Sequence, residues 1–128
     1  MVKPNIIAEI GCNHKGDIEI AKAMVSTAKT YCNVDVVKFQ KRDIKSFLST
    51  NESNSPHPVA YNSYGKTYGE HREFLEFSID QHKELKNHCD KIGIEYSSSV
   101  WDLKSALDII SIKPLECEYD GRVPAVHC

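Results

Sequence analysis

The sequence contains no long apolar run. No stretch approaches the roughly 18–20 consecutive apolar residues that a membrane-spanning helix needs. The short apolar stretch near the N-terminus is interrupted by Glu9, so it does not resemble a secretion signal either. These two absences predict a cytoplasmic protein that has no membrane partner.

The sequence also lacks a large excess of either positive or negative charge. The 128 residues include 16 Lys and Arg against 18 Asp and Glu, which gives a net charge of −2 with no basic block. This balance argues against a nucleic acid or an anionic membrane as the main partner. It is compatible with a small anionic substrate, because one or two well-placed lysines bind such a molecule without an overall positive charge.

Paired cysteines and paired histidines are missing as well. The five cysteines are an odd number at wide spacings without a CxxC pair, which predicts reduced thiols rather than a disulfide framework or a zinc site. No two histidines have the spacing of metal ligands. We therefore assign no metal ligand to this chain, and His127 near the C-terminus is given no such role.

What the sequence does contain is a repeated alternation of strand and helix. Strands are predicted over residues 6–10, 34–40 and 94–98 from their apolar and β-branched composition. Residues that begin or end helices stand between them: Asp17, Ser78 with Gln81, Gly93 and Asp102. Helical spacing predicts that these apolar side chains face the core: Ile18, Ala21, Met24, Val25, Ala28, Cys32, Leu85, Cys89, Ile92, Leu103, Ala106, Leu107 and Ile110.

Strands that alternate with helices imply a parallel sheet with right-handed crossovers, so the predicted fold class is α/β. The pattern alone does not separate a barrel from an open, doubly wound sheet. The nucleotide-binding motifs GxGxxG and GxxxxGK(S/T) are absent, which weakens the two common nucleotide-binding versions. Residues 41–69 form a long polar stretch that is typical of a functional loop or lid, and residues 70–77 are predicted to form a short helix.

The alternation stops after Pro114. A fourth strand is expected near this point, but residues 114–128 show no clean strand period. We interpret them as an off-pattern tail of the kind that a truncation or a shift of reading frame produces.

Polar side chains interrupt the predicted strands near their C-terminal ends. Glu9 stands in the first strand, Lys38 and then Gln40 end the second, and residues 97–99 of the third are serines. Because the carboxyl ends of parallel strands form the active-site rim of α/β proteins, these residues predict a site. The alternative is a structural ion pair between Glu9 and Lys38, since buried charges are costly unless they are paired.

Other polar residues fit two interpretations each. His14, in the loop after the first strand, is either a proton-transfer group or an exposed loop residue. Arg72 is either a clamp for an anion or part of a solvated helix start. His82 and His88 are expected on a helix surface or in its packing.

Four segments, in order, resemble the N-acetylneuraminate (sialic acid) synthase family. They are residues 6–16 (IIAEIGCNHKG), 36–40 (VVKFQ), 64–72 (YGKTYGEHR) and 94–102 (IEYSSSVWD). One such motif is weak evidence, but four in the family's order are strong evidence. The resemblance extends from about residue 6 to residue 113.

The resemblance implies a (β/α)8 TIM-type barrel followed by an antifreeze-like domain, in a homodimer. It also implies a transferase that condenses phosphoenolpyruvate with N-acetylmannosamine or a related amino sugar, giving a nonulosonic acid and phosphate. A divalent metal ion, Mn²⁺ or Mg²⁺, would polarise the sugar aldehyde. The family's metal ligands come from later strands, and no residue of this chain matches them.

Site residues can be carried over from the family position by position. Glu9 matches its active-site acid, Lys38 the lysine that holds phosphoenolpyruvate, and Ser98 a Thr or Ser that touches the same ligand. Gln40 and Asn13 are further substrate contacts. Glu9 and Lys38 therefore emerge both from the strand pattern and from the resemblance.

A barrel of this type takes about 250 residues, so residues 1–113 correspond to its first three βα units. This predicts an inactive fragment of a synthase. The alternative is a non-catalytic product that binds an anion or another subunit. An incomplete barrel is also expected to leave an open sheet edge at the third strand, which favours self-association.

Overall fold

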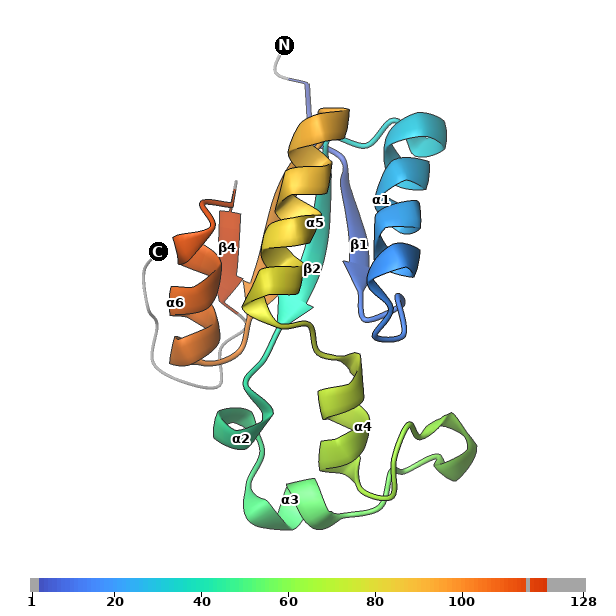
Figure 1. Ribbon diagram of the computed structural model, residues 1–128, viewed down its shortest axis with the longest axis vertical. Coiled ribbons are helices and arrows are strands. Elements are labelled where there is room, and N and C mark those ends of the chain that lie inside the picture. The colour runs from blue at the N-terminus through green and yellow to red at the C-terminus, as the bar shows by residue number, and fades with distance from the viewer. Residues whose placement is uncertain (1–2, 115, 120–128) are drawn as a thin grey trace.

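The computed structural model describes residues 3–114 and the backbone of residues 116–119. Its centre is a four-stranded parallel sheet in the order β1-β2-β3-β4 (Figure 1). The predicted α/β class and parallel sheet are therefore confirmed. The strands are β1 (Ile7–Gly11), β2 (Val36–Lys41), β3 (Glu95–Val100) and β4 (Glu116–Tyr119).

The three long helices lie on one face of the sheet, which Figure 1 shows with the helices toward the viewer. They are α1 (Ile18–Cys32), α5 (Ile79–Ile92) and α6 (Leu103–Ser111). Strands that follow one another in both sequence and space, joined by right-handed crossovers, place every connecting helix on the same side. The opposite face of the sheet carries none of these helices.

The predicted helix boundaries are confirmed. Asp17 accepts hydrogen bonds from the first turn of α1, Ser78 and Gln81 form a reciprocal capping box at α5, and Asp102 caps α6. Gly93 ends α5 in the left-handed conformation at φ 73°, which glycine adopts without a Cβ penalty.

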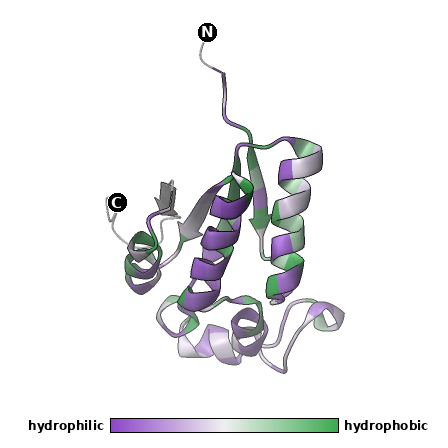
Figure 2. Ribbon diagram, turned by 45° about the horizontal axis from the view of Figure 1, so that its top comes forward, coloured by the Kyte–Doolittle hydropathy of each residue, from purple (hydrophilic) through white to green (hydrophobic). Residues whose placement is uncertain are grey.

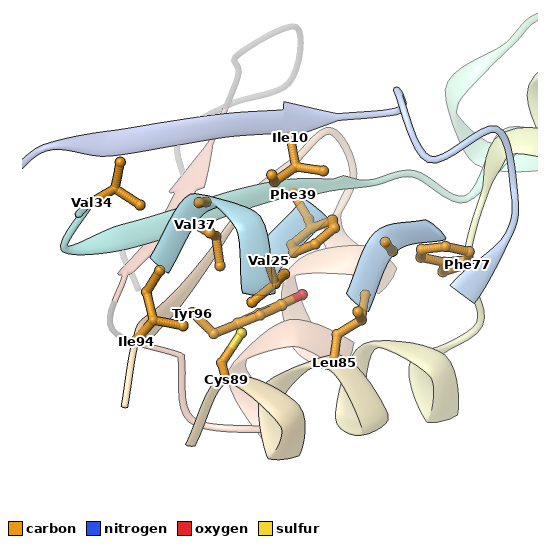
Figure 3. Close-up of a cluster of buried hydrophobic side chains, with 12 residues drawn as sticks. Ile10, Val25, Val34, Val37, Phe39, Phe77, Leu85, Cys89, Ile94 and Tyr96 are labelled. Atoms are coloured by element: carbon orange, nitrogen blue, oxygen red, sulfur yellow. The ribbon is translucent and has the colours of Figure 1, made fainter. Parts of the chain in front are cut away.

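The core lies between the sheet and the helices (Figure 3). Val37 and Phe39 of β2 and Tyr96 of β3 are fully buried and point toward α1 and α5, and the rings of Phe39 and Tyr96 stack with centroids 5.7 Å apart. Each large side chain buried in this way contributes roughly 1.5–3 kcal/mol. Figure 2 shows that α5 is otherwise largely hydrophilic, because only one stripe of it meets the core.

The predicted core faces of α1 and α5 are largely confirmed. Ala21, Val25 and Ala28 of α1 are buried, as are Leu85 and Cys89 of α5. Ile18, Met24 and Ile92 are partly buried against the same cluster, whereas Cys32 is exposed at the end of its helix.

The predicted core face of α6 is wrong except for Ala106. The helix buries Ser105, Ala106 and Ile109, whereas Leu103, Leu107 and Ile110 are 54%, 60% and 40% exposed. Asp102 sets this rotation, because its carboxylate accepts from both the backbone N–H and the hydroxyl of Ser105 and so turns Ser105 inward.

The expected fourth strand does form, at Glu116–Tyr119, where the sequence pattern did not identify one. It pairs in parallel with β3, with Ser97 opposite Glu116. Acidic residues are uncommon in strands, which explains why composition did not reveal it. The predicted open edge at the third strand is therefore wrong. Residue 115 and residues 120–128, most of the predicted tail and with it His127, lie outside the described residues.

The chain between β2 and α5 is folded rather than an extended loop. It contains α2 (Ile44–Phe47), α3 (Thr50–Asn54), η1 (Ala60–Asn62) and α4 (Tyr68–Leu75). The predicted short helix over residues 70–77 corresponds to α4, shifted by two residues. Figure 1 shows this excursion beyond the carboxyl ends of β1 and β2, where a lid over those ends would lie.

Two histidines are buried in the helix-covered layer. His82 has no exposed surface, and its Nδ1 lies 2.6 Å from the Tyr96 hydroxyl. His14 is 2% exposed, so it is not an exposed loop residue; it stacks on Phe77 with ring centroids 4.0 Å apart. Burial lowers the pKa of His82 to about 3 and the pKa of His14 to about 4, so both rings are neutral.

Stability should fall in mild acid because of these two rings. Below pH 6.5 the unfolded chain takes up protons at both histidines, while the folded protein does not until the pH approaches their lowered values. The free energy of unfolding should drop by about 2 kcal/mol per histidine between pH 7.5 and 5.0. Urea unfolding across this range measures the slope. His82→Gln should flatten this slope, and equal slopes in the variant and the wild type would contradict a neutral, buried His82.

Asp102 should be a stability-determining residue. Its Oδ2 also accepts from the backbone N–H of Asp43 at 2.7 Å, so one buried carboxylate joins α6 to the chain after β2. Asp102→Ala should lower the free energy of unfolding by about 2–3 kcal/mol, because it removes the cap and leaves buried donors unpaired. Asp102→Asn should cost less, since it keeps one accepting oxygen. Urea unfolding in which the alanine variant matches the wild type would contradict this role.

Candidate functional site

The face of the sheet opposite the long helices carries a row of polar side chains. Successive side chains of a strand point to opposite faces, so Lys38 and Gln40 point away from the face that buries Val37 and Phe39. The parallel register places Glu9 beside Lys38 and Lys38 beside Ser97. One step further along the strands, Gln40 stands beside Ser99. We call this the polar face: Glu9, Lys38, Gln40, Ser97 and Ser99.

Glu9 and Lys38 form an ion pair across β1 and β2. The Lys38 Nζ lies 2.7 Å from Glu9 Oε1, and the two side chains are 14% and 59% exposed, respectively. The structure therefore contains the ion pair that the sequence offered as the alternative to a site. Because more than half of the Glu9 side chain is exposed, the pair lies where a ligand can reach and exchange partners with it.

Gln40 is held by two neighbours. Its Oε1 accepts a hydrogen bond from Arg42 Nη2 at 2.7 Å and from the Cys12 thiol at 3.6 Å. Arg42 in turn pairs with Glu76 of the excursion at 3.1 Å, and its guanidinium lies 4.4 Å from the centre of the Trp101 ring. Burial raises the pKa of Glu76, an effect that the charge of Arg42 opposes. Arg42, Glu76 and Trp101 were not among the predicted site residues.

Ser98 is separated from the other predicted site residues. It stands beside Phe39, on the helix-covered face, and is fully buried. Its hydroxyl donates to the carbonyl of Ser99 at 3.2 Å. Ser97 and Ser99 are the serines that share a face with Lys38, so the structure does not bring Ser98 together with it. A contact of Ser98 with a ligand stays a prediction.

Asn13 lies beside the polar face, in the β1–α1 loop. Its side-chain amide donates to the carbonyl of Ile10 at 2.9 Å, which fixes its orientation. It lines a cavity of about 360 Å³ between this loop and the excursion, together with Cys12, Lys15, Tyr61, Asn62, Ser63, Tyr64 and Leu75. Hydroxyl and amide groups beside tyrosine rings suit a polyhydroxylated ligand.

His14 and Arg72 have structural partners. The Nδ1 of His14 accepts from the backbone N–H of Gly16 at 3.1 Å, so the buried ring holds the loop that carries Asn13. Arg72 belongs to the last turn of α4 rather than to a solvated helix start. Its Nη2 lies 3.9 Å from Glu76 Oε1, on the side of Glu76 that Arg42 also approaches.

The part of the chain that the structure describes does not form a metal centre by itself. Within residues 3–114, no group of three His, Cys, Asp or Glu side chains is close enough to hold a metal ion. Cys12, Cys32 and Cys89 are free thiols. Among the described helices, none is both long and apolar enough to cross a membrane.

Comparison with known proteins decides the family. The sequence model of the NeuB family matches residues 24–117, which is well over half of the chain. The chain belongs to the NeuB family. This confirms the relationship inferred from the four sequence segments. The match begins within α1 and ends within β4, so it spans β2 and β3 and the first two residues of β4.

Two relatives show how the NeuB chain compares in sequence. It is 47% identical over 97 residues to N-acetylneuraminate-9-phosphate synthase of Mus musculus, and 34% identical over 105 residues to N,N'-diacetyllegionaminic acid synthase of Campylobacter jejuni. These alignments cover 76% and 82% of this chain, but only 26% and 31% of the relatives. The chain therefore spans between a quarter and a third of the length of either relative.

One solved structure shows the same fold. The crystal structure of N-acetylneuraminic acid (sialic acid) synthetase from Leptospira borgpetersenii superposes with a TM-score of 0.69 at 22% identity. The superposition covers 89% of this chain and 35% of that one. The sheet and helices described above thus correspond to one part of a larger α/β protein.

The coupling free energy between Glu9 and Lys38 shows whether the ion pair stabilises the fold or can be exchanged for a ligand. Because Glu9 is mostly exposed, Glu9→Gln, Lys38→Met and the double variant should give a coupling free energy below about 1 kcal/mol in urea unfolding. Such a small value means that the charges are not kept for stability. A coupling above about 2 kcal/mol would instead support the purely structural interpretation.

Proposed function

We propose that this chain forms part of a sialic acid synthase-type enzyme, which condenses phosphoenolpyruvate with N-acetylmannosamine or a related amino sugar. The products are a nonulosonic acid and phosphate. The observation that carries the proposal is the row of Glu9, Lys38 and Gln40 near the carboxyl ends of adjacent parallel strands in a NeuB chain. This end of a parallel sheet is where α/β enzymes bind their substrates.

Lys38 binds the anionic phosphoenolpyruvate in this proposal. Its ammonium is a compact point charge that attracts a phosphoryl or carboxylate group. When the ligand arrives, Lys38 exchanges its partner Glu9 for the ligand anion, and the Glu9 carboxylate becomes available to accept a proton. Gln40 and Asn13 make further substrate contacts. The family resemblance also implies a contact of Ser98 with phosphoenolpyruvate, but Ser98 is buried on the helix-covered face, so the proposed site does not depend on it.

The reaction forms a carbon–carbon bond and breaks a carbon–oxygen bond. The methylene carbon of phosphoenolpyruvate attacks the aldehyde carbon of the open-chain sugar, which leaves an oxocarbenium centre at its neighbour. The aldehyde oxygen takes up a proton and becomes a hydroxyl group. Water adds to the oxocarbenium centre, and Glu9 accepts the proton that the water releases. Phosphate then leaves with its bridging oxygen, while the new hydroxyl group gives its proton to the departing phosphate and becomes the ketone carbonyl. Lys38 holds the phosphate through these changes.

The relatives support this substrate pair. Condensing a three-carbon unit with a six-carbon sugar gives a nine-carbon acid, in which sugar carbon 6 becomes carbon 9. The mouse relative is named for a 9-phosphate product, so a sugar 6-phosphate belongs among the candidate substrates. The Leptospira synthetase was crystallised with citrate, a small polycarboxylate, which supports anion binding by this fold.

We further propose that the sheet is a segment of a (β/α)8 barrel. Sequential strand order with every long helix on one face is the arrangement of a barrel, in which the helix-free face becomes the interior. This supports placing the polar face inside, at the substrate end. For the complete enzyme we expect a cytoplasmic homodimer.

The family resemblance also implies a divalent metal ion, Mn²⁺ or Mg²⁺. When bound, such an ion polarises the sugar aldehyde. The described residues do not provide a cluster that fits it, so no step assigned to this chain passes through the metal. The second candidate function is a non-catalytic piece that binds the anion without turnover.

Binding of phosphoenolpyruvate to the chain tests the proposal. Titration calorimetry should detect binding of phosphoenolpyruvate to the wild-type chain. Lys38→Met should raise the dissociation constant at least tenfold because the ammonium is lost. The control Lys83→Met, at an exposed lysine of α5, should bind like the wild type. A wild-type chain that binds no phosphoenolpyruvate, or a Lys38→Met variant that binds it equally well, would contradict the proposal.

Turnover separates the two candidate functions. The chain alone should release no phosphate from phosphoenolpyruvate with Mn²⁺ and either N-acetylmannosamine or its 6-phosphate, because its alignment with the mouse synthase covers only 26% of that relative. A phosphate-release assay with both sugars measures this. Sugar-dependent release by the purified chain would show that it is a complete catalyst and would overturn the prediction.

A further inference from the structure

Arg42 extends the polar face by one step beyond Gln40. Lys38, Gln40 and Arg42 alternate along the chain and so share one side of β2 and its continuation. Arg42 follows Lys41, the last paired residue of β2, just as Trp101 follows Val100 of β3. The guanidinium lies over the Trp101 ring, 4.4 Å from its centroid, and the Arg42 side chain is only 7% exposed.

Three elements fix the Arg42 side chain. Its Nη1 donates to Glu76 Oε1 at 3.1 Å, and its backbone N–H donates to the other oxygen of the same carboxylate at 3.0 Å. Trp101 covers one flat side of the guanidinium, as cation–π pairs do. The other terminal nitrogen, Nη2, donates to Gln40 Oε1 at 2.7 Å, and Nη1 also lies 3.7 Å from Cys12 Sγ. Arg42 is therefore held rigidly, in a way that a flexible surface arginine is not.

This arrangement determines which end of the Gln40 amide meets the guanidinium. A guanidinium has only donors, so the group 2.7 Å from Arg42 Nη2 has to be the amide oxygen. The Cys12 thiol, 3.6 Å away, donates to the same oxygen. With its oxygen engaged twice, the amide presents its NH₂ group, with two donors, on the side away from Arg42.

We propose that Arg42 is a positioning residue, which locks the Gln40 side chain so that it serves as a hydrogen-bond donor to an acceptor group of the substrate. The recognised group is a carboxylate or carbonyl oxygen. Residues two apart on a strand are separated by about 7 Å. The Gln40 amide and the Lys38 ammonium can therefore each bind one anionic group of the same small molecule. The identity of that molecule as phosphoenolpyruvate rests on the proposed function; the positioning of Gln40 does not.

The position of Arg42 relative to the ligand distinguishes positioning from simple charge attraction. Arg42 is buried, is paired with Glu76 and donates to Gln40, so we expect most of its effect on a ligand to pass through the Gln40 amide. If Arg42 acts through Gln40, replacing Arg42 should not weaken ligand binding any further once Gln40 has been replaced. If Arg42 acts by its charge, the two replacements should reduce the binding free energy additively. A double-variant cycle measures this directly.

The first measurement is the NMR signal of the Gln40 side-chain amide. In the wild type, relaxation should show an NH₂ group as rigid as the backbone. In Arg42→Met, at a folded fraction verified by circular dichroism, the group should become mobile on the picosecond-to-nanosecond timescale. Arg42→Lys, which keeps a donor but cannot make the planar contacts, should restore part of the rigidity. An amide equally rigid in Arg42→Met overturns the proposal whether or not any ligand binds.

The second measurement is the affinity for phosphoenolpyruvate. Arg42→Met and Gln40→Met should each weaken binding about tenfold, the loss expected for one well-made hydrogen bond to an anion. The double variant should bind no more weakly than Gln40→Met alone. Additive losses would show that Arg42 acts by charge and would refute positioning. A wild-type chain that binds no phosphoenolpyruvate would contradict the proposed function. The NMR signal of the Gln40 amide would still test the role of Arg42 in that case.

Discussion

The parallel register of β2 with its neighbours is the constraint on which the rest of the structure depends. Buried between β1 and β3, β2 sorts its residues strictly by alternation: Val37 and Phe39 enter the apolar core, while Lys38 and Gln40 occupy the polar face. A slip of one residue would exchange the two sets, burying a lysine among apolar side chains. The same register that holds the core therefore brings Glu9 and Lys38 together.

The excursion after β2 ties this face to the rest of the protein. Glu76, the residue that follows helix α4, pairs with Arg42, while Asp102 of the β3–α6 connection accepts a hydrogen bond from the backbone N–H of Asp43. These two carboxylates, both largely buried, secure the chain at the end of β2 from opposite sides. Gln40 lies next to this anchored point, so its orientation depends on contacts far away in the sequence. The orientation of Gln40 is thus fixed by buried ion pairs and hydrogen bonds outside the polar face, whereas Glu9 and Lys38 hold each other.

Local signals in the sequence were sufficient for several features. Helix caps at Asp17, Ser78 and Asp102 depend only on neighbouring residues, and Glu9 and Lys38 stand out as charges within apolar strands. Features set by distant contacts were not predictable. The rotation of α6 follows from the bonds of Asp102, and β4 forms because β3 offers it an edge. The predicted ligand contact of Ser98 depends on its place in a family motif, whereas strand alternation puts Ser97 and Ser99 beside Lys38. The same alternation predicts that Arg42 lies on the side of Lys38 and Gln40.

An anionic substrate that binds to the helix-free face of the sheet should contact one of the two lysines of β2 and not the other. Lys38 lies on the polar face, whereas Lys41 points to the helix-covered side and lies 3.9 Å from Asp108 of α6. The measurement is the NMR shift of the methylene group next to each ammonium as phosphoenolpyruvate is added. We expect a saturable shift at Lys38 and none at Lys41. A shift at Lys41 alone, or equal shifts at both, would contradict binding to this face.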